Sequence, residues 1–184
     1  MTTPTRTART DPGRYGLVAV GFHWVLALLI PGMIALGWYM MSIEREPGSA
    51  WYFNLHKAIG LLIAVLVLLR LFWRLTHPPA ALPASMPAWQ ATAARWSHRL
   101  LYVAMIAMPS LGIAGTLFSK SGLATFGWSA PRLFAPNHDT AELFYGAHSV
   151  TAWILVVLIA LHVLAGLKHL LIDRDGVFQR MWHA

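Results

Sequence analysis

Histidine is the residue type whose number and placement in this chain point to chemistry. The 184 residues include nine histidines and no cysteine. Neutral imidazole is a common metal ligand, whereas the lack of thiols excludes disulfides, thiolate zinc sites, iron–sulfur clusters and cysteine-attached haem. Any metal or metal-containing cofactor must therefore be held by histidine, methionine or carboxylates.

The spacing of His148 and His162 narrows the choice of cofactor. These residues are fourteen positions apart in one apolar segment, which in a helix places them within ~40° of the same face and ~21 Å apart. That distance is too great for one metal ion to be shared. Two independent zinc or copper sites are one alternative, but two stacked haems fit the spacing better.

The segments that must position these histidines are strongly apolar. The chain is 57% hydrophobic and 11% charged, against about 25% charged residues in an ordinary soluble domain. Four apolar blocks each reach the ~20 residues that are needed to cross ~30 Å of hydrocarbon, at about 17–41, 55–75, 96–118 and 145–172. The sequence therefore predicts an all-α fold, an integral membrane four-helix bundle with its cofactors inside the bundle.

The rest of the chain divides around this bundle. We expect one membrane domain over residues 16–175, a flexible N-terminal tail over 1–15 and a short C-terminal tail over 176–184. Pro47-Gly48 marks a turn between the first two helices, and a loop of about Ser119 to Phe144 joins the last two. The aromatic residues of that loop fit headgroup level, although a lid over an outer site is an alternative.

Basic residues predict the orientation of the bundle. Lys and Arg are enriched on the cytoplasmic side of membrane proteins, and ten lie at one end of the predicted helices against four at the other. Both termini are thus expected in the cytoplasm. This topology, together with anionic lipid, explains the net charge of +7, and we find no basic-aromatic motif for nucleic acid.

The predicted helices arrange four histidines in two pairs by depth. His23 and His162 lie toward the cytoplasmic side, and His56 and His148 lie toward the outer side. Each is followed four positions later by a small residue that would let a macrocycle approach the backbone; these residues are Ala27, Gly60, Ala152 and Gly166. Ordinary helix packing also uses such residues, and a single membrane histidine can be a hydrogen-bonded interface residue. Two depth-matched pairs favour haem ligation.

Four further residues are candidates for neighbouring roles. His98 lies at a depth where it competes with His23 for the partner of His162, but His23 lies deeper in its apolar block. His169 lies seven residues, or ~10 Å, beyond His162, which suits a group that binds and protonates a quinone; an interfacial histidine is the alternative. Arg70 and Arg74 suit haem propionates as well as ordinary cytoplasmic anchoring.

These residues give the chain a family resemblance along nearly its whole length. It resembles the bacterial cytochrome b561 group, short relatives of the cytochrome b subunits of nickel hydrogenases and formate dehydrogenases. The resemblance rests on five motifs, which are Gly21-Phe22-His23-Trp24, His56-Lys57-Ala58-Ile59-Gly60, Arg70-x3-Arg74, His98-x3-Tyr102 and His148-x13-His162-x6-His169.

The resemblance implies a function and a location in the bacterial inner membrane as well as a fold. It implies two haem b groups, one on His23 with His162 and one on His56 with His148, and a ubiquinone near His169. Short members resemble superoxide oxidases, which move electrons from periplasmic superoxide to ubiquinone. One alternative is a membrane anchor that takes electrons from a periplasmic dehydrogenase, and another is a haem-free transporter or assembly protein.

Overall fold

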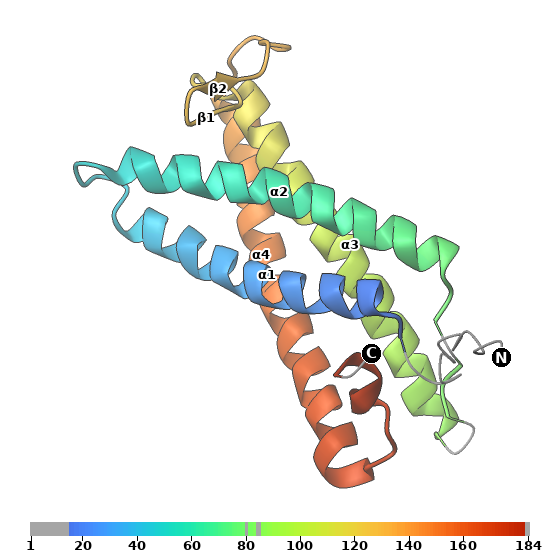
Figure 1. Ribbon diagram of the computed structural model, residues 1–184. Coiled ribbons are helices and arrows are strands. Elements are labelled where there is room, and N and C mark those ends of the chain that lie inside the picture. Colours follow the sequence, from blue (N-terminus) through green and yellow to red (C-terminus); the bar gives the residue numbers. More distant parts are fainter. Residues whose placement is uncertain (1–14, 80, 84–85, 183–184) are drawn as a thin grey trace, which may run out of the picture.

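The structure, a computed structural model, describes residues 15–79, 81–83 and 86–182. Four long helices and one small hairpin make up most of it (Figure 1). In chain order the main elements are α1 (Leu17–Ser42), α2 (Ser49–Thr76), α3 (Ala88–Phe118), β1 (Ala124–Thr125), β2 (Trp128–Ser129) and α4 (His138–Lys168). Helix α4 continues directly into a π-helical turn, η1 (His169–Asp173). After a short turn, a 3-10 helix, η2 (Phe178–Met181), follows. Apart from Tyr15, the predicted N-terminal tail lies outside the described residues.

All four helices are long and apolar enough to cross a membrane. The spans are Leu17–Ser42, Ser49–Thr76, Ala88–Phe118 and His138–Asp173. Many of their large apolar side chains face outward, among them Leu28 at 75% and Phe72 at 65% exposure, which is favourable when lipid is the solvent. The predicted all-α membrane bundle is confirmed, and the chain is a multi-pass membrane protein.

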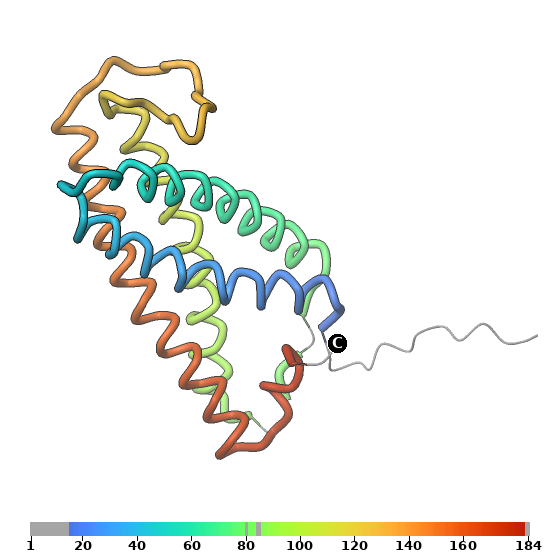
Figure 2. Tube along the Cα trace, turned by 60° about the vertical axis from the view of Figure 1, so that its left-hand side comes forward, coloured from blue at the N-terminus to red at the C-terminus, as the bar shows by residue number. Residues whose placement is uncertain are grey.

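The helices pack as two antiparallel pairs. α1 lies against α2 and α3 against α4, with α2 also contacting α3, and the first pair crosses the second in both views (Figure 1, Figure 2). The Pro47-Gly48 turn lies between α1 and α2 as predicted, with Gly48 in the left-handed region at φ 86°. We call the end of the bundle that carries the hairpin the hairpin end, and the opposite end, where α1 begins, the terminal end.

The core of the bundle lies where the two helix pairs cross. It is made of aliphatic side chains from all four helices, namely Leu26, Ile30, Ile34, Ile63, Val67, Leu101, Ala104 and Leu155. Leu26, Val67 and Leu155 have less than 2% of their surface exposed. Part of this core, made of Ile30, Ile34, Ile63 and Leu155, also lines the space beside two of the histidines described below.

Three helices begin earlier than the apolar blocks indicate. α2, α3 and α4 begin at Ser49, Ala88 and His138, whereas hydropathy placed their starts at about 55, 96 and 145. Hydropathy marks the hydrocarbon crossing, but a helix can continue into the headgroup region, where polar side chains are solvated. At α4 the side chain of Asn137 caps the helix by accepting a hydrogen bond from the Thr140 amide at 2.9 Å. The predicted loop from Ser119 to Phe144 therefore ends at Asn137.

The C-terminal segment packs against the bundle, where the sequence predicted a tail. After η1 the chain turns back, so that η2 lies beside the start of α1 (Figure 2). The indole of Trp24 donates a hydrogen bond to the Met181 carbonyl at 2.7 Å, and the Arg180 side chain donates to the Ala81 carbonyl at 2.8 Å. These contacts connect the segment to α1 and to the linker after α2.

Candidate functional site

One histidine pair lies toward the hairpin end. His56 of α2 and His148 of α4 face each other with ring centroids 6.0 Å apart and planes at 73°. The Nδ1 of His148 lies 2.8 Å from the Met108 carbonyl oxygen; since a carbonyl only accepts, Nδ1 carries the proton and Nε2 is left free to ligate. The Nδ1 of His56 is buried and has no hydrogen-bond partner among the described residues.

Two glycines bring helix backbone directly against these rings. A Cβ on Gly37 of α1 would lie 3.3 Å from Cε1 of His56, and a Cβ on Gly112 of α3 would lie 3.2 Å from Cε1 and Nδ1 of His148. Both distances are closer than ordinary side-chain contact. Larger residues at these two positions would displace the histidine rings, so both positions require glycine for the rings of this hairpin-end pair to keep their places.

The surroundings of the hairpin-end pair are apolar. A cavity of about 60 Å³ lies beside the two rings and is lined by aliphatic residues and methionines. Its lining includes Met33, Met105 and Met108, whose flexible side chains adapt to a bound group. Such walls favour an apolar group over a hydrated ion.

Three histidines meet toward the terminal end. His162 of α4 lies with its ring centroid 6.1 Å from that of His23 of α1 and 5.4 Å from that of His98 of α3. Nδ1 of His98 lies 2.8 Å from the Ala94 carbonyl oxygen in its own helix. The structure thus brings together the predicted pair, His23 and His162, and adds His98 as a third member of what we call the terminal-end trio.

Cationic and hydroxyl groups border this trio. The Arg70 side chain of α2 lies 3.2 Å from Nδ1 of His23 and donates to the Tyr102 hydroxyl at 3.3 Å. Arg74 lies over the Tyr102 ring, 5.7 Å from its centroid. Guanidinium groups at this position are well placed to bind carboxylates such as haem propionates.

The spacing of the rings tests whether a haem fits. Two histidines on opposite sides of one iron, each bonded at ~2 Å, have ring centroids about 6 Å apart. The values of 6.0 Å for His56 with His148 and 6.1 Å for His23 with His162 match this requirement. The unpartnered nitrogen of His56 and the apolar walls agree with it. The residues therefore fit haem, although the assignment of the four axial ligands stays a prediction.

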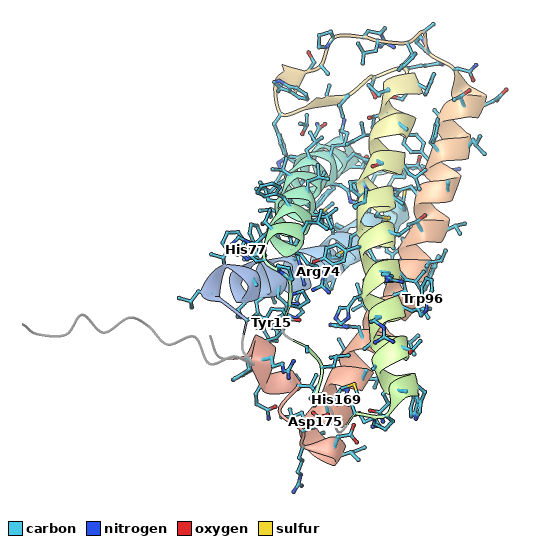
Figure 3. All side chains as sticks on the ribbon, turned by 90° about the vertical axis from the view of Figure 1, so that its right-hand side faces the viewer. Tyr15, Arg74, His77, Trp96, His169 and Asp175 are labelled. Atoms are coloured by element: carbon cyan, nitrogen blue, oxygen red, sulfur yellow. The ribbon has the colours of Figure 1, made fainter. Side chains whose placement is uncertain are left out.

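His169 lies beyond the trio, at the start of η1. Its Nδ1 lies 2.7 Å from a carboxylate oxygen of Asp175, and the imidazole is only 14% exposed. Figure 3 shows the two residues together at the terminal end. The other histidines of the described chain lie elsewhere: His77 stacks on Trp73, and His138 begins α4. His183 lies outside the described residues.

Sequence reasoning missed several of these neighbours. Helix α3 contributes His98 and Tyr102, which the sequence motifs already included, and also Gly112 and the Met108 carbonyl, which no motif predicted. One signal was available: glycine is unfavourable in a helix interior by about 1 kcal/mol, so Gly37 and Gly112 within predicted spans indicated close approach. No local pattern linked Asp175 to His169, because the turn between them is irregular.

Comparison with known proteins identifies the family. A sequence model of the family described as prokaryotic cytochrome b561 matches residues 14–184. This chain belongs to that family. Membership makes it a membrane electron-transfer cytochrome that binds haem b, in agreement with the two histidine sites.

Curated relatives of this prokaryotic cytochrome b561 match it over nearly their whole length. Cytochrome b561 homolog 2 of Escherichia coli (strain K12) is 36% identical over 178 residues, covering 92% of each chain. Cytochrome b561 homolog 1 of the same organism is 29% identical over 175 residues, covering 91% of this chain and 96% of its own. A protein named probable superoxide oxidase CybB of Yersinia pestis is 28% identical over 172 residues, covering 91% and 95%.

Proposed function

We propose that this cytochrome is a di-haem superoxide:ubiquinone oxidoreductase. The observation that carries the proposal is the presence of two histidine pairs at two depths, each with ring centroids about 6 Å apart, which is the spacing that one iron between two imidazoles requires. Haem b, when bound at both places, supplies one-electron carriers near each face of the membrane. His56 with His148 would hold one group, and His23 with His162 the other.

We further propose that the terminal end faces the cytoplasm and the hairpin end the periplasm of an inner membrane. Within the described residues, basic side chains at the terminal end outnumber those at the hairpin end. The first group is Arg70, Arg74, Arg95, Arg99, Lys168, Arg174 and Arg180, and the second is Arg45, Lys57, Lys120 and Arg132. The positive-inside rule supports this orientation.

In this orientation the two ends of the bundle would carry out different half-reactions. The hairpin end would take electrons from superoxide, and one relative in the family is named a probable superoxide oxidase. At the terminal end, Arg70 and Arg74 would bind haem propionates, and His169, seven residues or about two helix turns beyond His162, would bind and protonate ubiquinone. A donor protein, such as a periplasmic dehydrogenase, is the alternative source of electrons. Because the family binds haem b, a haem-free transporter or assembly protein is less well supported.

The test uses the purified, haem-loaded chain in detergent. We expect two low-spin b haems per chain from the reduced-minus-oxidised spectrum and haem quantification, and superoxide loss faster than spontaneous dismutation only when ubiquinone is present. His77→Ala, which changes a histidine outside both sites, should behave like the wild type. Two haems without any acceleration would favour the dehydrogenase partner, and fewer than two haems would contradict the paired sites.

A further inference from the structure

His169 and Asp175 form a close pair at the terminal end (Figure 3). Nδ1 of His169 lies 2.7 Å from Oδ2 of Asp175, and the two side chains are 14% and 19% exposed. An ionised carboxylate only accepts hydrogen bonds, so Nδ1 must donate. The contact fixes the proton on Nδ1 and leaves Nε2 as the nitrogen that can exchange a proton with a ligand.

The chain holds Asp175 in place through an irregular turn. Arg174 and Gly176 on either side of it both adopt left-handed conformations, at φ 50° and 79°, which turn the chain back after η1. The second carboxylate oxygen of Asp175 accepts a hydrogen bond from the Val177 amide at 3.1 Å. The carboxylate is therefore oriented by the backbone and does not depend on a ligand for its position.

A second carboxylate nearby provides a contrast. Asp173 is 3.4 Å from the same Nδ1 of His169, but it is also ion-paired with Lys168. Among the described residues, neither Arg174 nor Arg180 forms an ion pair with Asp175; Arg174 donates to the Leu171 carbonyl and Arg180 to that of Ala81. In the described part of the chain, His169 is the ionic partner of Asp175.

We propose that Asp175 is a positioning residue for quinone reduction. Its carboxylate holds the His169 ring so that Nε2 delivers a proton to a quinone carbonyl oxygen, and it stabilises the ring when both nitrogens are protonated. This role rests on the proposed function, which places the quinone at His169.

The proton and electron balance is that of ordinary quinone reduction. Each quinone takes up two electrons, which the cytochrome supplies one at a time, and two protons, and is released as the quinol. As each O–H bond forms, the N–H bond at Nε2 of His169 breaks. The ring then regains its proton from water at the terminal end, while its Nδ1–H stays bonded to Asp175.

The experiment measures quinone reduction by the reduced cytochrome itself, without superoxide or a donor protein. The full haem-loaded chain is reduced with dithionite, the excess reductant is removed, and haem oxidation is followed after mixing with ubiquinone-1. We expect Asp175→Asn to lower the maximal rate about tenfold or more, with the half-saturating quinone concentration and the binding affinity from tryptophan fluorescence within about twofold of wild type. Asp175→Glu should recover part of the rate.

Asp173→Asn is the matched control, because it removes the carboxylate that Lys168 already neutralises. Its rate should stay within about threefold of wild type. Equal slowing in Asp173→Asn, or an unchanged maximal rate in Asp175→Asn, would overturn the positioning role. Asp175→Ala is measured alongside, so that a haem-loaded variant is available if the asparagine variant fails to fold.

His169→Ala separates the two proposals. If it leaves quinone reduction unchanged, the proposed quinone site is wrong and the role of Asp175 is overturned with it. If it slows the reaction but Asp175→Asn does not, the quinone site stands and only the positioning role is overturned.

Discussion

The hairpin-end pair is enclosed by apolar side chains and helix backbone, whereas the terminal-end trio is bordered by two arginines and a tyrosine hydroxyl. At the hairpin end, the Met108 carbonyl accepts a hydrogen bond from His148. The backbone at Gly37 lies close against the ring of His56, and that at Gly112 lies close against the ring of His148. At the terminal end, a third histidine and the charged side chain of Arg70 contact the predicted pair. The first site depends on close packing and the second on electrostatics, so the two should respond differently to substitution.

The largest effect should come from removing a hairpin-end ligand. We expect His148→Ala to reduce haem from two per chain to one, because no other histidine of the described chain lies beside His56 to replace it. Haem quantification and the reduced-minus-oxidised spectrum measure this loss. His138→Ala, in the same helix but outside the pair, should keep both haems. Retention of two haems in His148→Ala would mean that His148 is not an axial ligand.

At the terminal end, whether the haem is lost should depend on which histidine is replaced by alanine. The 6.1 Å spacing of His23 from His162 suits a shared iron, whereas the 5.4 Å spacing of His98 is shorter than the about 6 Å required. We expect His23→Ala to lose the terminal-end haem and His98→Ala to retain it, as measured by haem content and by the low-spin spectrum. The reverse result would assign the ligand to His98.

A smaller effect should follow from filling the space at a hairpin-end glycine. In Gly112→Val the added carbons would meet the His148 ring, since even a Cβ would lie 3.2 Å from it, and such overpacking costs about 1–3 kcal/mol. We expect partial loss of the hairpin-end haem and a lower temperature of haem release. Gly32→Val is the control, because a Cβ there has nothing within 4 Å. Equal haem release in both variants would argue against a packing effect at Gly112.

The smallest effect should be a change of potential at the terminal end. Arg70→Gln removes a positive charge next to His23, which stabilises the reduced haem less and should lower its midpoint potential by roughly 20–60 mV, on the basis of about 1 kcal/mol of screened interaction. Redox titration with optical detection measures both haems. Arg95→Gln, whose side chain bonds Thr92 at the surface, should leave both potentials unchanged. An equal shift at the hairpin-end haem would show that the charge acts over the whole bundle.

Much of this architecture could be predicted from particular residues. The four apolar blocks and the Pro47-Gly48 turn predicted the number and order of the helices, and the fourteen-residue spacing of His148 and His162 predicted two depths. The helix starts could not be read from hydropathy, because residues such as Trp51 and Asp139 extend the helices into the headgroup region. The spacing of the histidines along the chain also did not show that the rings of His98 and His162 lie side by side, because that contact depends on how helix α3 is rotated against α4.

Hydropathy and helical periodicity are local properties, so the order of the residues was enough to predict that the chain spans a membrane and that histidines could provide paired ligands at two depths. The folded arrangement of the helices was needed to show which rings face each other at about 6 Å, which glycines lie against them, and which carboxylate bonds His169. Those contacts depend on helix rotation, crossing and the turn after η1, which arise from packing between segments far apart in the chain.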